Sequence, residues 1–400
     1  MLKAKVIGIG AAGNKAAIKL LEEGVMDKPS VLLLNSTLKD IPEAYKEYAI
    51  EFGDTKGCGK ERNLAKKMIL ESLQNGQVSL DQFIDQDDRM VIIVTSAEGG
   101  TGCGASSIIA EYMYGVLNLH VHMFVFCGFE DDARGLKNTV DWFNDLKDSY
   151  TVEAISNKKF LEEAHNVRSK AEQLANAEFA KRVVILLGQN IVPSENNIDD
   201  TDLFKLTTTP GFMTIEHHNL DKVRNMEDFN ASLQDMIDNS KSLDNEQSAK
   251  RIGVIINCSD KTQHFIDLSF SVLKEQYGIP FELFTHIQNV HDEEYVNVIV
   301  SGMKIPYDDI KETYNKYKKQ MESVDLAKDK FFDSFGKFDT SSGDDLDIGS
   351  NKFNSAGDKD TVEGNKDDFF SKFGVKRNNK DIKDKLNQTA AQTISTKNEL

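Results

Sequence analysis

The chain has 400 residues, enough for two globular domains, and a formal net charge of −17 at neutral pH. Because an acidic surface repels phosphates, direct DNA binding by the protein body is excluded, and any link to DNA needs a basic adaptor. The four cysteines lack CxxC spacing and no apolar run reaches about 18 residues, so we expect a cytoplasmic protein without structural zinc or direct membrane binding.

The first part of the chain alternates short apolar runs with amphipathic stretches. The apolar runs predict buried strands at residues 6–9, 31–34, 91–95 and 121–127. The amphipathic stretches predict helices at residues 14–22, 61–73, 105–114 and 138–146. This βαβα order is typical of a parallel sheet covered by helices, so residues 1–175 are interpreted as a Rossmann-like α/β domain.

A long, mostly buried helix is predicted at residues 171–192, before a polar, Asn/Asp-rich stretch at 194–201. We assign residues 176–209 to this central helix and an insertion. The remaining elements are a turn at Pro210-Gly211, helices at 220–237 and 307–324, and strands at 251–256, 281–287 and 295–300. These predict a second, smaller α/β domain over residues 210–325.

The composition changes after about residue 325, where Asp, Lys, Ser, Asn and Gly dominate. Apolar residues are too sparse there for a core, so residues 326–400 are predicted to be a disordered tail. Within this tail an aromatic motif at 330–337 is repeated at 368–376. The repeat suggests a docking element that folds on binding, and the alternative is a chance excess of phenylalanine in a charged linker.

A first glycine loop, Gly8-Ile9-Gly10-Ala11-Ala12-Gly13, follows the first strand and opens the first helix. In that context the GxGxxG pattern turns backbone amides and a helix N-terminus toward an anion. Most such loops bind NAD or FAD, but a dinucleotide site needs an acid at the end of the second strand. Residues 34–37 contain none, so an NAD-dependent oxidoreductase is only a remote alternative.

A second glycine loop, Gly99-Gly100-Thr101-Gly102-Cys103-Gly104, follows the strand at 91–95 and opens another helix. Positions without side chains let backbone N–H groups approach phosphate oxygens, and the Thr101 hydroxyl adds a donor. Two such loops on neighbouring strands predict a site for nucleotide phosphates. A Walker A loop is absent, because Gly59-Lys60 is followed by Glu61.

The second loop resembles the GGGTGTG signature of the tubulin/FtsZ family, with Glu98 in place of its first glycine. The resemblance covers about residues 3–320 and implies that the chain binds GTP and GDP. It implies roles for Asn35 after the second strand, Gly57 in a loop that senses the γ-phosphate, Arg134 near the ribose and Asn176 at the guanine. The full implied nucleotide-binding set is Gly10, Ala11, Ala12, Asn14, Asn35, Gly57, Gly99, Gly100, Thr101, Gly102, Cys103, Arg134, Asn157 and Asn176.

In this family the next subunit completes the active site with a loop of sequence PGLIN-x-D-x-x-D. Alignment on Pro210-Gly211 places Glu216 at the first acid and Asn219 at the second, and a one-residue shift brings in Asp221 instead. By resemblance, such a carboxylate positions water for attack on the γ-phosphate, assisted by Mg²⁺. Adjacent His217 and His218 diverge by about 100° on a helix, so no metal site of protein ligands is predicted.

Within the family the chain looks most like the TubZ group of plasmid and phage tubulins. The long tail, the insertion and the divergent loops indicate this group. The resemblance implies a GTPase that forms head-to-tail filaments and segregates plasmid or phage DNA. Its implied partners are further copies of itself and a small DNA-binding centromere adaptor held by the tail. An FtsZ-like cell-division GTPase is the alternative.

Overall fold

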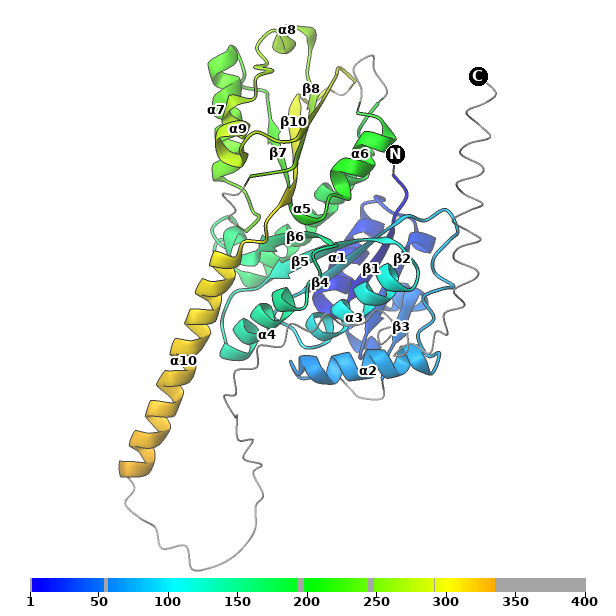
Figure 1. Cartoon of the computed structure of the whole chain (residues 1–400), viewed down its shortest axis with the longest axis vertical. Coiled ribbons are helices and arrows are strands. Elements are labelled where there is room, and N and C mark those ends of the chain that lie inside the picture. The colour runs from blue at the N-terminus through cyan, green and yellow to red at the C-terminus, as the bar shows by residue number, and fades with distance from the viewer. Residues whose placement is uncertain (1, 54–56, 193–197, 244–247, 291, 335–400) are drawn as a thin grey trace, which may run out of the picture. The chain divides into compact units, whose positions relative to one another are not determined.

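A computed structural model of the chain describes residues 2–53, 57–192, 198–243, 248–290 and 292–334, with side chains up to residue 323. Residues 1–328 form one compact unit, and a second unit begins at residue 329. Of the expected tail, residues 326–334 continue the last helix, whereas the end of the first aromatic motif and all of the second lie outside the described residues, from 335 onward. The described strands form a single ten-stranded sheet in the order β3-β2-β1-β4-β5-β6-β7-β10-β8-β9 (Figure 1).

The first six strands are parallel, which confirms the predicted Rossmann-like sheet. They are β1 (Lys5–Ile9), β2 (Val31–Asn35), β3 (Ala49–Glu51), β4 (Met90–Ser96), β5 (His120–Cys127) and β6 (Thr151–Ser156). Most are covered on both faces, so their sequences read as nearly continuous apolar runs. The strand order changes direction at β1, which pairs with β2 on one side and β4 on the other. Parallel sheets bind ligands at such a switch point.

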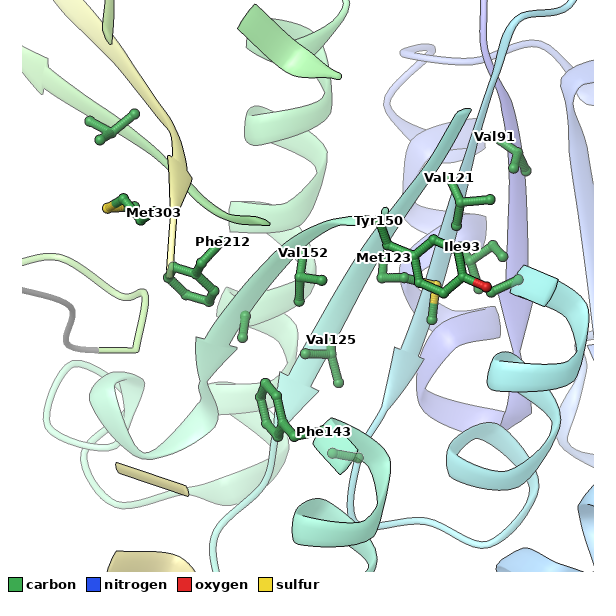
Figure 2. Packing of buried hydrophobic residues seen from close by; sticks show 14 of the residues in the cluster. Val91, Ile93, Val121, Met123, Val125, Phe143, Tyr150, Val152, Phe212 and Met303 are labelled. Atoms are coloured by element: carbon green, nitrogen blue, oxygen red, sulfur yellow. The ribbon is translucent and has the colours of Figure 1, made fainter. Parts of the chain in front are cut away.

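Alternate residues along each strand enter two separate hydrophobic cores, as the two-residue period of a strand requires. Ile7 and Ile9 of β1 enter the core beneath α2, α3 and α4, and Val6 enters the core beneath α1 and α5. Figure 2 shows that the first core runs from Val91 on β4 as far as Met303 on β10. The helices are α1 (Gly10–Glu22), α2 (Arg62–Gln74), α3 (Thr101–Gly115), α4 (Ala133–Asn144) and α5 (Arg168–Leu186), with 3-10 turns η1 (Lys28–Ser30), η2 (Leu38–Asp40), η3 (Glu43–Tyr48) and η4 (Asn157–Phe160).

The other four strands continue the same sheet, with β10 antiparallel to both of its neighbours, β7 and β8. They are β7 (Gly211–Asn219), β8 (Arg251–Asn257), β9 (Glu282–Gln288) and β10 (Tyr295–Met303). The helices here are α6 (Asp200–Thr207), α7 (Met226–Asp238), α8 (Asp260–Gln263), α9 (Ser271–Tyr277) and α10 (Tyr307–Ser334). No helix in the described part of the chain is both long enough and apolar enough to span a membrane.

The two halves of the sheet meet at a short seam between β6 and β7. These strands pair only from Thr151↔Gly211 to Glu153↔Met213. Beyond this point the segment between α7 and β8 takes the place of β7, with Ile155 and Ser242 forming an antiparallel bridge. The Leu243 amide then donates to the Ala154 carbonyl at 3.0 Å. The boundary we expected near residue 210 is therefore crossed by a continuous sheet.

Several expected elements differ from the structure; the helix expected at 220–237, for example, begins only at Met226. The expected catalytic loop at 210–219 is strand β7, in which every residue from Phe212 to Glu216 is buried. The central helix ends at Leu186, where Gly188 takes the left-handed conformation at φ +66°, rather than at residue 192. The last helix continues past residue 324 to Ser334.

Candidate functional site

A hollow of about 440 Å³ lies at the carboxyl ends of β1, β2 and β4, at the switch point of the sheet. Loops from four places in the sequence line it. The lining residues are Ile9, Gly10, Ala11, Ala12, Asn35, Ser36, Thr37, Lys39, Asp40, Gly57, Cys58, Gly59, Ser96, Gly99, Gly100, Thr101 and Gly102. The structure thus gathers nine of the predicted residues in one place: Gly10, Ala11, Ala12, Asn35, Gly57, Gly99, Gly100, Thr101 and Gly102.

The first glycine loop is glycine-rich because backbone packs directly on backbone there. A Cβ at Gly13 would lie 2.2 Å from the Val94 carbonyl oxygen of β4. Gly10 has φ +74°, and a Cβ on it would approach the Gly102 amide nitrogen to 2.9 Å. The first and second glycine loops are therefore held against each other without side chains between them.

The second glycine loop forms the first turn of α3, which begins at Thr101 rather than at the expected residue 105. A Cβ on Gly102 would lie 2.8 Å from the Ile9 carbonyl oxygen. The Thr101 hydroxyl lies 2.9 Å from the Ser36 hydroxyl at the end of β2. Free amides at a helix N-terminus, with two hydroxyls beside them, form a site suited to phosphate oxygens.

A third loop, residues 57–60, closes the hollow with an unusual backbone. Gly57, Gly59 and Lys60 have φ values of 127°, 52° and 64°. Outside the hollow the Lys60 ammonium lies 2.5 Å from Asp132, and Arg134 pairs with Glu61. These pairs are about half exposed, so each contributes little to holding the loop.

The other predicted nucleotide residues do not line the hollow. Asn14 lies beneath it, with its amide donating to the Leu34 carbonyl at 3.3 Å. The Cys103 thiol donates to the Asn138 carbonyl at 3.3 Å, and burial raises the pKa of this thiol to about 11. Arg134 is engaged with Glu61, and Asn157 begins the turn after β6. Sequence reasoning placed Cys58 and Gly59 in the third loop beside Gly57 but missed Ser36, Thr37, Lys39, Asp40 and Ser96, most of which lie at or just after the end of a strand.

Asn176 is half-buried on α5, about one turn beyond Glu172. Glu172 pairs with Lys15 of α1 at 3.6 Å, so this part of α5 lies beside the helix that the first glycine loop opens. Its role at a base remains a prediction.

The chain is similar in sequence and in structure to known proteins. No family model matches it. It is 29% identical over 206 residues to the cell division protein FtsZ of Mycoplasmopsis pulmonis, covering 50% of this chain and 51% of that protein. The chain spans about half the length of the curated relatives it matches.

Two solved protofilaments extend the likeness across the fold. The GTPγS-form protofilament of TubZ from Bacillus thuringiensis serovar israelensis has a TM-score of 0.67 at 19% identity, covering 81% of this chain and 94% of that one. The GTPγS-bound protofilament of CetZ2 from Haloferax volcanii has a TM-score of 0.66 at 16% identity, covering 80% and 100%. The chain has the tubulin/FtsZ fold.

Within this tubulin/FtsZ fold, Glu216 lies in a buried polar cluster and not at a surface. Its side chain is 7% exposed and 3.5 Å from the Arg182 guanidinium, which pairs with Glu153 and Glu178 at 2.6 Å each. The hydroxyls of Thr214 and Ser240 donate to Glu216 Oε1 at 2.6 and 2.5 Å. Glu216 therefore has charged and hydrogen-bonding partners inside its own subunit. Its assignment to catalysis, with Asn219 and Asp221, stays a prediction.

The electrostatics of this Arg182 cluster fit a structural role. Burial would lower the pKa of Arg182, but the carboxylates of Glu216, Glu178 and Glu153 raise it, so the guanidinium stays charged. Burial raises the pKa of Glu216, although Arg182 and the neighbouring hydroxyls oppose the shift. His217 and His218 follow on a strand, so their side chains point to opposite faces of the sheet.

The acid motif of the tubulin/FtsZ family, N-x-D-x-x-D, also fits residues 197–202, Asn197-Ile198-Asp199-Asp200-Thr201-Asp202. Asn197 lies outside the described residues. Asp199 caps α6 by accepting hydrogen bonds from the amides of Thr201 and Asp202 at 2.8 Å. The motif could have been found by looking for its acid spacing after the central helix instead of anchoring on Pro210-Gly211.

Asp199 and Asp202 of this 197–202 motif lie near the amino ends of the parallel strands, whereas the hollow lies at their carboxyl ends. The carbonyl of Leu187, just after α5, accepts a hydrogen bond from the Leu2 amide at 3.0 Å, just before β1 begins. A Cβ on Gly188 would meet Leu203 of α6, so the start of α6 lies near this end of α5. The glycine loops follow the other ends of the strands. A motif at this edge cannot reach the hollow of its own subunit.

Proposed function

We propose that this chain is a GTPase that assembles head to tail into filaments. The observation that carries the proposal is the hollow itself, in which three backbone loops converge at the switch point of a sheet with the tubulin/FtsZ fold. The two protofilament neighbours are named for GTPγS forms, which supports guanine nucleotide as the ligand. Titration with GTP, GDP and NAD tests this, and preferential binding of NAD would reject it in favour of a dinucleotide enzyme.

The proposal includes Mg²⁺ bound with the nucleotide. Mg²⁺ usually keeps several waters and binds one or two protein groups beside the phosphate oxygens. The hydroxyls of Ser36 and Thr101 and the carboxylate of Asp40 line the hollow and would hold such an ion. Among the described residues no cluster of three or more His, Cys, Asp or Glu side chains forms a separate metal cage. When bound, Mg²⁺ offsets charge that develops on the phosphates.

We further propose that Asp199 and Asp202 act on the nucleotide of the adjacent subunit. Head-to-tail stacking would bring the α5–α6 end of one subunit over the hollow of the next, because the two lie at opposite edges of the parallel strands. A carboxylate there would orient water for in-line attack on the γ-phosphate. The alternative alignment uses Glu216, Asn219 or Asp221, and the same experiment separates the two.

The experiment measures phosphate release and pelleting with GTP. Asp199→Asn keeps an oxygen for the helix cap while removing the charge, and Asp202→Asn removes the second acid. We expect phosphate release to fall on the order of 100-fold for at least one of them, with nucleotide binding and pelleting preserved. Small amounts of either variant should also slow turnover in wild-type filaments.

Asp200→Asn is the control, because Asp200 lies at the same helix start but outside the motif acids. Normal turnover in both Asp199→Asn and Asp202→Asn would reject the 197–202 alignment. Loss of turnover in folded Glu216→Gln or Asp221→Ala would then support the alignment on Pro210-Gly211.

For the cellular role we propose segregation of plasmid or phage DNA in the cytoplasm. The TubZ neighbour supports this role, and the four free thiols support a reducing compartment. The adaptor would be a small DNA-binding protein held by residues 326–400. A truncation after Val324 should assemble normally yet fail to capture an adaptor–centromere complex. Capture equal to that of the full chain would exclude the tail as the docking site.

A cell-division GTPase is the second candidate, because the curated relatives matched in sequence are named FtsZ. Fluorescent fusions in host cells separate the two roles. Filaments that move with plasmid or phage DNA favour segregation, and a ring at the division site favours cell division.

A further inference from the structure

One buried side chain, Asn138 of α4, joins two of the loops that line the hollow. It is 4% exposed. Its Nδ2 amide group lies 3.1 Å from the Lys60 carbonyl, 3.2 Å from the Glu98 carbonyl and 3.1 Å from the Gly99 carbonyl. Lys60 belongs to the third loop, and Glu98 and Gly99 begin the second glycine loop. A single NH₂ group therefore holds both loops from behind.

Peptide geometry shows what this contact does for the hollow. In a trans peptide the carbonyl of one residue points opposite to the N–H of the next. Holding the carbonyls of Glu98 and Gly99 toward α4 therefore turns the N–H groups of Gly99 and Gly100 the other way. Both glycines line the hollow, so these N–H groups are aimed at the space where phosphate oxygens would lie.

The α4 backbone reinforces the arrangement, because the Asn138 carbonyl accepts the Cys103 thiol at 3.3 Å. Two ion pairs also join this region to α4 and the residue before it: Lys60 of the third loop pairs with Asp132, and Glu61, just after the loop, pairs with Arg134. Both pairs are about half exposed. Exposed ion pairs contribute little to stability, whereas buried carbonyls left without a donor cost more. Asn138 is thus the dominant side-chain contact holding these loops together.

We propose that Asn138 is a positioning residue for nucleotide binding, which orders the second and third loops before the nucleotide arrives. This inference rests on the proposed function, since it assigns Asn138 to the same hollow. The first glycine loop makes no contact with the Asn138 side chain and packs on β4 and Gly102 instead. Loss of the amide should therefore loosen two loops and leave the first in place.

The test compares Asn138→Leu, which keeps the same branching at Cγ but has no donor, with wild type. Binding of a fluorescent GTP analogue should weaken about tenfold, mainly through faster dissociation. Hydrogen exchange of the nucleotide-free protein should quicken in peptides covering 57–61 and 98–102 and stay unchanged in 8–13. Thr139→Val is the matched control, because Thr139 is a buried neighbour that donates only to the Gly135 carbonyl of its own helix, at 3.0 Å.

Wild-type affinity and exchange in folded Asn138→Leu would overturn the inference. If that variant fails to fold, Asn138→Ser replaces it, since the shorter hydroxyl cannot reach all three carbonyls, and the same loosening is expected. If wild type itself does not bind GTP, the proposed function fails, while the exchange pattern still shows whether Asn138 orders the loops.

Discussion

The hollow at the ends of β1, β2 and β4 and the cluster around Arg182 are built in opposite ways. The hollow is made largely of backbone, with glycines that let loops from distant positions touch. The Arg182 cluster is made of side chains from β6, α5, β7 and the segment before β8, brought together inside the protein. A backbone site leaves a local pattern in the sequence, whereas a side-chain cluster leaves none.

The difference extends to energetics. Where the glycine loops pack closely, at Gly10, Gly13 and Gly102, an added methyl group should destabilise the protein, because another atom lies within 2.9 Å of where its Cβ would stand. In the Arg182 cluster, removing one group should destabilise the protein, because three carboxylates share one guanidinium away from water. Each region can therefore be tested by the opposite kind of substitution.

The largest expected effect is that of Arg182→Met, which would leave Glu153, Glu178 and Glu216 without their shared cation. Breaking a buried pair costs about 3–5 kcal/mol, so the unfolding free energy in denaturant titration should fall by that amount. Arg168→Met is the control, because Arg168 pairs with Asp131 at an exposed position and should cost less than about 1 kcal/mol. Equal, small losses in both variants would remove the contrast between the cluster and the surface.

A smaller effect is expected for Gly13→Ala, whose added Cβ would lie 2.2 Å from the Val94 carbonyl. Overpacking of this kind costs roughly 1–3 kcal/mol, so thermal unfolding should shift to lower temperature. Gly99→Ala should leave folding stability close to wild type, because nothing lies within 4 Å of a Cβ there. If Gly99→Ala is as damaging as Gly13→Ala, close packing does not explain the glycines.

The smallest effect concerns pH and His120 of β5. Burial, followed by the nearby His122, lowers the pKa of His120 to about 4 from its ordinary value of 6.5. As pH falls below 6.5, His120 becomes protonated in the unfolded chain but stays neutral in the folded protein. Its contribution to stability is therefore fully present above pH 6.5 and is lost as pH falls toward 4. Between pH 7.5 and 5.5 the unfolding free energy of His120→Gln should therefore fall by about 1.4 kcal/mol less than that of wild type, as measured by denaturant titration at both pH values. An unchanged pH dependence would mean that His120 is not the responsible group.

Much of the fold could be predicted because its signals are local. The buried strands of the parallel half read as apolar runs, and Gly10, Gly99 and Thr101 stand in loops whose pattern directly follows a strand. Helix α6 was missed because its start looked like a polar linker. Asp199 at its N-cap and Asp200 and Asp202 in its first turn were in fact helix-start signals.

Other residues could not be found from local pattern. Asn138 matters through carbonyls at positions 60, 98 and 99, and nothing near it in the sequence indicates those partners. Glu216 was placed in a loop because Pro210-Gly211 resembled a family motif, yet tertiary pairing with β6 and β10 makes the segment a strand. The sequence alone does not distinguish an acid in a buried strand from an acid in an exposed loop, because the residues that pair with it lie far away along the chain.

The seam between β6 and β7 has a mechanical consequence. A tensile force between the two halves of the sheet would be carried directly only by the short register from Thr151↔Gly211 to Glu153↔Met213, which is as short as that of the edge pair β2–β3. The 241–243 segment reinforces this pairing, since the bridge between Ser242 and Ile155 carries part of the load beyond the end of the β6–β7 register. We therefore expect the two halves of the sheet to separate first at this seam under tension.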